Sequence, residues 1–331
     1  MRKIRGLVRY GIAASLLLTT LSANAFVKGA DVSWVSAMES AGYSFYNSSG
    51  HQQDLFQILK SYGINAIRLR VWVDPSYYNG IQDVIRKAKR AKAAGMKIMI
   101  DFHYSDTWAD PAHQKTPSKW SKYSFNGLMK AMWWYTHDSL VQLKKAGISP
   151  AWVQIGNETN NGMLWPDGKA SKNMKNFAWL INTGYSATKK VFPGAKVIVH
   201  LANCQNNKAF RWIFDGLHRY SAKYDIIGAS IYPTTVSSNW KKVESQCYNN
   251  LNDMVSRYHK SVMITEIGAP WDNKNAKSIV STMINYTRHV KNGKGLGVFY
   301  WEPESSNYKN YTMGAWNPNS GRPMATMNAF R

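Results

Sequence analysis

Short apolar runs alternate with longer amphipathic segments along most of this chain. Runs this short, bounded by polar residues and glycines, are typical of strands buried on both faces, and the longer segments between them have the period of helices. The expected strands are Val27–Val32, Asn65–Val71, Lys97–Phe102, Trp152–Ile155, Lys196–His200, Ile226–Ile231, Val262–Glu266 and Gly297–Trp301. The expected helices are Gln53–Tyr62, Ile81–Ala94, Phe125–Ala146, Lys172–Val191, Lys208–Tyr220, Trp240–Tyr258 and Ala276–Val290.

This alternation predicts an α/β fold with a parallel sheet. Eight strands in about 300 residues favour a closed (β/α)8 barrel, the TIM barrel, formed as a single domain. An open doubly wound sheet is the alternative, but no glycine-rich phosphate loop follows the first strand. The segments that follow the strands hold most of the polar and aromatic residues, so we expect the functional site at the C-terminal ends of the strands.

The first 25 residues have the pattern of an export signal. A basic start precedes the apolar stretch 11–21, and Ala23-Asn24-Ala25 resembles a cleavage site. The apolar stretch is shorter than the roughly 20 residues of a spanning helix, so we expect cleavage near Ala25 and no stable membrane association. We expect the barrel to be 26–331, exported to the periplasm or the extracellular space.

The full chain carries a net charge of +23, from 42 Lys and Arg against 19 Asp and Glu. Removal of four cations with the leader leaves 42 − 4 − 19 = +19, a field that attracts polyanions such as nucleic acid or an acidic polysaccharide. The densest basic run, Arg86–Lys92, lies on a helical pattern and is typical of a solvated face. No zinc-finger or RNA-binding motif accompanies it, which argues against a nucleic-acid partner.

The chain has two cysteines, Cys204 and Cys247. An exported protein can oxidise them, but their spacing leaves open whether they pair. No metal-binding cysteine spacing is present. A metal site made of His103, His113, Asp106 and Asp110 is conceivable but lacks a recognised ligand spacing, so we expect neither a metal nor a cofactor.

Two glutamates carry the chemical prediction. Glu158 follows the strand Trp152–Ile155, and Glu266 ends the strand Val262–Glu266. Two carboxyl groups that meet across a cleft are the equipment for glycosidic bond cleavage. Burial would let Glu158 act as an acid, and the adjacent Asn157 could bind a sugar hydroxyl. A structural role for either glutamate is the alternative.

Arg68 and Arg70 share one face of the second strand by the two-residue period. A guanidinium beside Glu266 would keep that carboxylate ionised as a nucleophile. Two inward arginines need carboxylate partners, so a purely structural ion-pair network is the alternative for one of them.

Hydrogen-bonding and aromatic residues also gather at other strand ends, where they could bind and stack on sugars. After the third strand these residues are His103, Tyr104, Asp106 and Trp108, and after later strands they are His200, Tyr232 and Trp301.

Several motifs resemble the endo-β-1,4-galactanases of glycoside hydrolase family 53, also called arabinogalactan endo-β-1,4-galactanases. They are Gly29–Trp34, which contains Asp31, together with Arg68–Val73, Asp101–Pro111, Gly162–Gly168 and Phe299–Pro303. The resemblance implies a retaining (β/α)8 hydrolase in which Glu158 is the acid/base, Glu266 the nucleophile and Asn157 the partner of the sugar 2-hydroxyl. It also implies a strand arginine, which we take as Arg68, beside the nucleophile.

The sequence departs from the family pattern just after each glutamate, at Thr159–Asn161 and at Ile267–Trp271. The short segment 271–275 lacks recognisable calcium ligands, so we expect no structural calcium. The resulting hypothesis is a monomeric hydrolase of galactan on pectin. The alternatives are a related hydrolase of another β-1,4 glycan, such as mannan or cellulose, an inactive glycan-binding barrel, and a nucleic-acid binder suggested by charge alone.

Overall fold

The computed structural model describes residues 25–331, in which eight parallel strands form a closed barrel. The strands are β1 (Val27–Asp31), β2 (Ala66–Val71), β3 (Lys97–Phe102), β4 (Trp152–Ile155), β5 (Lys196–Leu201), β6 (Ile226–Ile231), β7 (Ser261–Ile267) and β8 (Gly295–Trp301). They pair in sequence order, and β8 closes on β1. The predicted (β/α)8 barrel is confirmed. The predicted signal peptide, apart from Ala25, lies outside the described residues.

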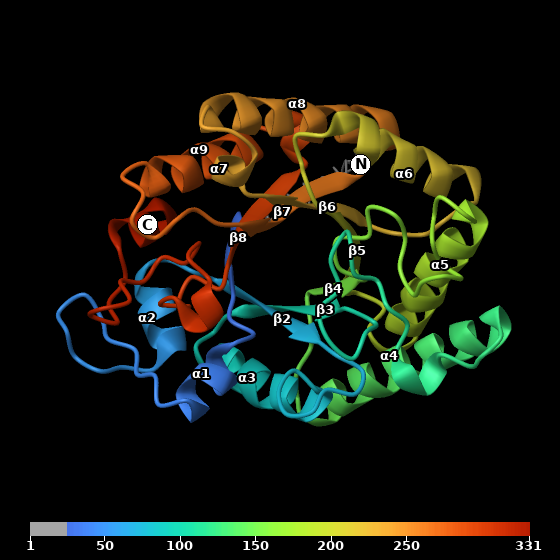
Figure 1. The fold of residues 1–331 in the computed structure, drawn as a ribbon, viewed down its shortest axis with the longest axis horizontal. Helices are drawn as coiled ribbons and strands as arrows, with labels where there is room; N and C mark the ends of the chain where they lie inside the picture. Colours follow the sequence, from blue (N-terminus) through green and yellow to red (C-terminus); the bar gives the residue numbers. More distant parts are fainter. Residues whose placement is uncertain (1–24) are drawn as a thin grey trace, which may run out of the picture.

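Helices surround the barrel as an outer ring (Figure 1). They are α1 (Val35–Ser40), α2 (Leu55–Ser61), α3 (Ile81–Ala93), α4 (Phe125–Lys145), α5 (Met174–Val191), α6 (Asn207–Arg219), α7 (Pro233–Val236), α8 (Trp240–Tyr258) and α9 (Ala276–Arg288). The seven predicted helices are present, whereas the short α1 and α7 were not predicted. Among the described residues, none of these helices combines the length and apolarity that crossing a bilayer requires.

Side-chain caps decide where two helices begin. Asp54 accepts hydrogen bonds from the backbone of Phe56 and Gln57, so α2 begins later than the predicted Gln53. Asn173 caps α5 in the same way, and that helix begins at Met174 rather than at Lys172.

The barrel interior changes from apolar to polar along the strands. A plug fills the end where the strands begin, and it consists of Val27, Ala66, Met99, Trp152, Ile198, Ile226, Met263 and Phe299. Two residues further along, the strands place Arg68, Asp101, Gln154 and His200, all buried, on the same inward face. Buried polar groups at only one end of the barrel locate the functional site there.

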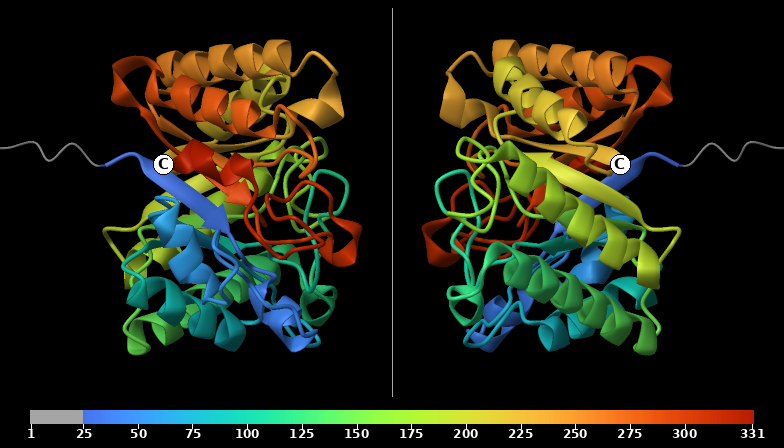
Figure 2. Two further views of the ribbon diagram at one scale, coloured as in Figure 1. Left: turned by 90° about the vertical axis from the view of Figure 1, so that its left-hand side faces the viewer. Right: turned by 90° about the vertical axis from the view of Figure 1, so that its right-hand side faces the viewer.

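The long connections gather at that same end (Figure 2). The chain after β8 contributes a long loop there before it returns to a last 3-10 turn, Ala325–Phe330, which buries Met327 and Phe330. In the structure a disulfide between Cys204 and Cys247 joins the loop after β5 to α8.

Candidate active site

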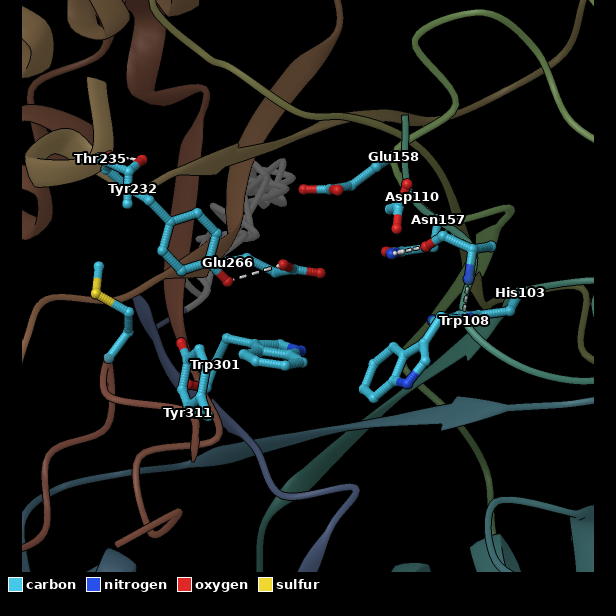
Figure 3. A pocket seen from close by; sticks show the side chains of 12 residues that line it. His103, Trp108, Asp110, Asn157, Glu158, Tyr232, Thr235, Glu266, Trp301 and Tyr311 are labelled. Atoms are coloured by element: carbon cyan, nitrogen blue, oxygen red, sulfur yellow. Dashed lines mark hydrogen bonds between the residues drawn. The ribbon is translucent and has the colours of Figure 1, made fainter. Parts of the chain in front are cut away.

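A cavity of about 410 Å³ opens at the C-terminal ends of the strands (Figure 3). Its lining residues are His103, Trp108, Ala109, Asp110, Asn157, Glu158, Tyr232, Thr235, Glu266, Trp301, Tyr311 and Met313. They come from the C-terminal ends of five strands, β3, β4, β6, β7 and β8, and from the segments that follow them. The two glutamates predicted from the sequence therefore face one cleft.

Glu158 and Glu266 approach each other closely across this cleft. A carboxylate oxygen of each and a ring nitrogen of His200 all lie within 4.8 Å of one another. Retaining glycosidases hold their two carboxyl groups about 5–5.5 Å apart, whereas inverting enzymes need about 6.5–9.5 Å to admit a water. The spacing fits the retaining arrangement.

A bulge in β7 aims Glu266 into the barrel. The pairing of β6 with β7 passes from Ala229 opposite Ile264 to Ser230 opposite Glu266, so Thr265 is an extra residue. Strict alternation from the inward Met263 would turn Glu266 outward. Glu158 reaches the same space from a left-handed turn after β4, with φ of 46°.

Arg68 binds three buried carboxylates at the floor of the cleft. Its Nη1 lies 2.8 Å from Asp31 Oδ2, and its Nη2 lies 2.8 Å from Asp101 Oδ2 and 2.9 Å from Glu266 Oε1. Arg68 Nη2 also donates to Asn157 Oδ1 at 2.8 Å. The arginine expected beside Glu266 is thus Arg68.

The two glutamates differ in their charged neighbours. Burial, and then the negative charge of Glu266, raise the pKa of the Glu158 carboxyl. Burial also raises the pKa of Glu266, but the Arg68 guanidinium opposes that rise. The Tyr232 hydroxyl adds a hydrogen bond to Glu266 Oε2 at 3.0 Å. A single proton shared by this site therefore belongs on Glu158, and the negative charge on Glu266.

Asn157 lines the cavity beside Glu158, whereas His200 is fully buried behind it and is not part of the lining. His200 Nδ1 lies 2.9 Å from Asn157 Oδ1, and His200 Nε2 lies 2.6 Å from Ser230 Oγ. Burial lowers the pKa of His200 well below its ordinary value, so the ring is neutral. Asn157 Nδ2 donates to Ala109 O at 2.8 Å and lies at the cavity wall.

Arg70 contacts Glu302 and an aromatic residue of the cavity lining, Trp108, and does not contact Glu158 or Glu266. Its Nη1 lies 2.6 Å from Glu302 Oε1, and its guanidinium carbon lies 4.3 Å from the centre of the Trp108 ring. Trp108 and Trp301 lie with ring centres 5.9 Å apart and line the cavity. Arg70 thus packs directly on Trp108, and Trp301 contacts Trp108 from the other side of the cavity lining.

The third-strand residues divide between the cleft and the protein interior. His103 lines the cavity, and its Nε2 lies 3.1 Å from Asp101 Oδ2. The structure does not bring Tyr104 or Asp106 to the cavity lining. Tyr104 is buried and hydrogen-bonds Thr136 in α4 at 2.8 Å, and Asp106 accepts from the backbone of Ser118. The expected sugar contacts of these two residues are corrected accordingly.

Several functional positions were missed. Tyr311 and Met313 lie in the loop after β8, and Thr235 lies in the short helix α7, so no periodic pattern in the sequence marks them. Gln154 hydrogen-bonds both Asp101 and Asn157, at 2.6 and 3.1 Å. The two-residue period of β4 could have identified Gln154 as an inward-facing polar residue.

The cluster of Glu158, His200 and Glu266 also has the spacing of a cation site among the described residues. Arg68 already pairs with Glu266, and both ring nitrogens of His200 have hydrogen-bond partners. The positive charge that a cation would supply is therefore already provided by Arg68.

Comparison with known proteins agrees with this geometry. The profile of "Glycosyl hydrolase family 53" matches residues 27–330. The chain is 37% identical over 299 residues to an arabinogalactan endo-beta-1,4-galactanase of Humicola insolens, covering 83% of this chain and 89% of the relative. It is 34% identical over 309 residues to an endo-beta-1,4-galactanase of Bacillus subtilis, covering 84% and 70%.

A solved fungal beta-1,4-galactanase superposes with a TM-score of 0.84 at 31% identity, covering 92% of this chain and 98% of that structure. The family match spans nearly all of the described barrel and includes both glutamates. The chain is therefore a glycosidase that belongs to glycosyl hydrolase family 53.

Proposed function

We propose that the protein is a retaining endo-β-1,4-galactanase, with Glu266 as nucleophile and Glu158 as acid/base. The observation that carries the assignment is the close approach of these two carboxyls, which lie within 4.8 Å of each other in the cleft. The substrate class follows from the galactanase relatives, which match more than four-fifths of this chain.

In the first step Glu266 attacks the anomeric carbon of a galactosyl residue, and the bond to the leaving oxygen breaks. Glu158 gives its proton to that oxygen, so the departing sugar leaves as an alcohol. Arg68 holds Glu266 Oε1 at 2.9 Å and keeps it ionised for the attack. The product of this step is a covalent galactosyl-enzyme.

In the second step Glu158, now ionised, removes a proton from water while the water attacks the same carbon. The bond to Glu266 breaks and the β configuration is restored. The negative charge that has returned to Glu266 is again stabilised by Arg68 and by the Tyr232 hydroxyl. Asn157 is placed to bind the 2-hydroxyl, a contact that strengthens as the sugar approaches the transition state.

Trp108 and Trp301 supply stacking surfaces for the sugar rings beside the scissile bond. An open cleft lined by aromatic rings accommodates a chain that continues in both directions, which is the requirement for cleavage of internal bonds. The proposal therefore specifies endo action on galactan and type I arabinogalactan side chains of pectin.

Export is part of the proposal. Pectin is a polymer too large to enter a cell intact, so an enzyme that cleaves it must be exported. The first 25 residues have the pattern of an export signal. The Cys204–Cys247 disulfide supports an oxidising compartment, because disulfides are rare where thiols are kept reduced. We propose a monomer that works alone on its polymer.

The test is incubation with purified β-1,4-galactan, followed by sizing of the products and NMR of the newly formed reducing end. We expect a series of short oligosaccharides. The reducing end formed by cleavage should appear first as the β anomer. Release of monosaccharide alone would contradict endo action, and an α anomer would contradict retention. Parallel incubations with mannan and cellulose test the related specificities, and faster cleavage of either would overturn the choice of galactan.

A further inference from the structure

The outer face of α4 and α5, away from the active-site cleft, carries a groove of about 480 Å³. Figure 1 shows these two helices side by side in the outer ring. Met129, Lys130 and Trp133 line it from α4, and Asn182, Thr183 and Ser186 line it from α5. Each set follows the three- and four-residue spacing of one helix face, so the two faces form a continuous trough.

Trp133 lines this α4–α5 groove, and two exposed tryptophans, Trp134 on α4 and Trp179 on α5, lie on the same two helices. Trp134 is 57% exposed and Trp179 is 39% exposed. Trp133 Nε1 donates to Ser186 Oγ at 2.8 Å, and the Trp133 ring stacks on His137 with centres 4.8 Å apart. Large aromatic side chains gathered on an outer surface mark a binding site more often than a packing accident.

The groove is also basic. Lys130 lines it, and the Lys175 ammonium lies 4.7 Å from the centre of the Trp179 ring, one turn earlier on α5. The groove-facing positions of both helices hold no aspartate or glutamate. The surface therefore combines ring planes with positive charge, which favours a flat, anionic ligand over a neutral one.

We propose that the α4–α5 groove binds an acidic polysaccharide, a chain of pyranose rings that carry carboxylates. The apolar face of a sugar ring stacks on Trp133, and the carboxylates pair with Lys130 and Lys175. Ser186 Oγ accepts from Trp133 and still has a hydroxyl hydrogen to donate to the sugar. From Trp179 to Ser186 the helix rises about 10 Å, room for about two sugar rings.

The choice of ligand rests on the proposed function, because galactan side chains are attached to the uronate backbone of pectin. A groove that holds the backbone would keep the cleft near the side chains and raise their effective concentration. The acidic polymer would then be bound at a defined site and not only attracted by the net positive charge of the chain.

The experiment is native electrophoresis through gels that contain polygalacturonate, which the proposed activity does not cleave. We expect retardation of the wild-type protein and at least about a fivefold rise in Kd for Trp133→Ala/Trp179→Ala and for Lys130→Ala/Lys175→Ala. The matched controls are Trp212→Ala, an exposed tryptophan on α6, and Lys241→Ala/Lys242→Ala on α8, and both should bind as the wild type does.

Equal weakening in the groove and control lysine variants would overturn the proposal in favour of a general charge effect, as would equal retardation in gels that contain DNA. No retardation of the wild type, or retardation by neutral galactan that the groove variants lose, would overturn the acidic ligand. Sedimentation that shows a dimer lost in the groove variants would assign the groove to a second copy of the chain. Hydrolysis of linear galactan, measured on every variant, tests the proposed function separately, because the groove variants should keep it unchanged.

Discussion

Arg68 Nη2 lies 2.9 Å from Glu266 Oε1 in the middle of the barrel, and the same guanidinium contacts Asp31 and Asp101 at 2.8 Å. One cation thus serves three carboxylates that are all nearly inaccessible to solvent. The arrangement fixes the position of Glu266 and opposes the rise in pKa that burial alone would cause.

Arg68→Lys should lower kcat about 100-fold and change KM much less, because a lysine keeps the charge but cannot span the carboxylates with a planar fork. A weaker cation beside Glu266 lets its pKa rise, so the acidic limb of the kcat/KM profile should move to higher pH. The pH dependence of kcat/KM on galactan measures this. An unmoved acidic limb together with full kcat would show that Arg68 is only structural.

The alkaline limb should belong to Glu158. Burial and the charge of Glu266 raise the pKa of Glu158 to about 8, so the wild type should lose activity as pH rises through that value and the acid loses its proton. Glu158→Gln should remove this limb and lower kcat on galactan about 100- to 10,000-fold. A limb that persists in Glu158→Gln would assign the titration to another group.

Azide distinguishes the two glutamates by product stereochemistry. In Glu158→Ala an activated aryl galactoside still forms the galactosyl-enzyme, and azide should release β-galactosyl azide. In Glu266→Ala azide should attack the substrate directly and give α-galactosyl azide. NMR of the products identifies the anomer. If the two variants gave the opposite anomers, the roles of the two glutamates would be reversed. If both variants gave the same anomer, the assigned roles would be wrong.

The sequence predicted the barrel well because its signals are local. The apolar runs and the glycines at helix ends depend on near neighbours, and strands such as β3 and β4 match the predicted bounds at both ends. The positions of Glu158 and Glu266 at strand ends followed from the same pattern, as did the inward face shared by Arg68 and Arg70.

The sequence could not show where the backbone leaves its regular path. Tyr104 follows β3 with φ of 52° and lies buried, where its hydroxyl hydrogen-bonds Thr136 in α4 instead of reaching the cleft. The bulge at Thr265 depends on pairing between strands, which no single segment encodes. Tyr311 reaches the cavity only because the long loop after β8 folds back over the barrel.

Glu244 should make stability depend on pH. It is fully buried on α8, neither carboxylate oxygen has a hydrogen-bond partner among the described residues, and burial raises its pKa to about 9. The folded protein therefore binds a proton here that the unfolded chain loses above about pH 4.5, so the stability contribution falls as pH rises from that value toward 9.

Glu244→Gln removes this titration and should raise the free energy of unfolding at pH 8 by on the order of 1–3 kcal/mol, with little change at pH 4. Urea unfolding at both pH values measures the difference. The exposed Asp138→Asn serves as a control and should show no such pH dependence. Equal stability of Glu244→Gln and wild type at both pH values would mean that Glu244 is solvated or paired.

The Cys204–Cys247 disulfide should stabilise the fold without contributing to catalysis. It joins positions 43 residues apart in sequence, so it restricts a large part of the unfolded chain, and its loss should cost about 2–4 kcal/mol. Neither cysteine lines the active-site cavity. Cys204→Ala/Cys247→Ala should therefore unfold at lower urea concentration but keep kcat at temperatures where it remains folded.

The wild type treated with reductant should behave like this variant, whereas the variant itself should not respond to reductant. A reductant-insensitive wild type would show that the two cysteines do not pair in solution.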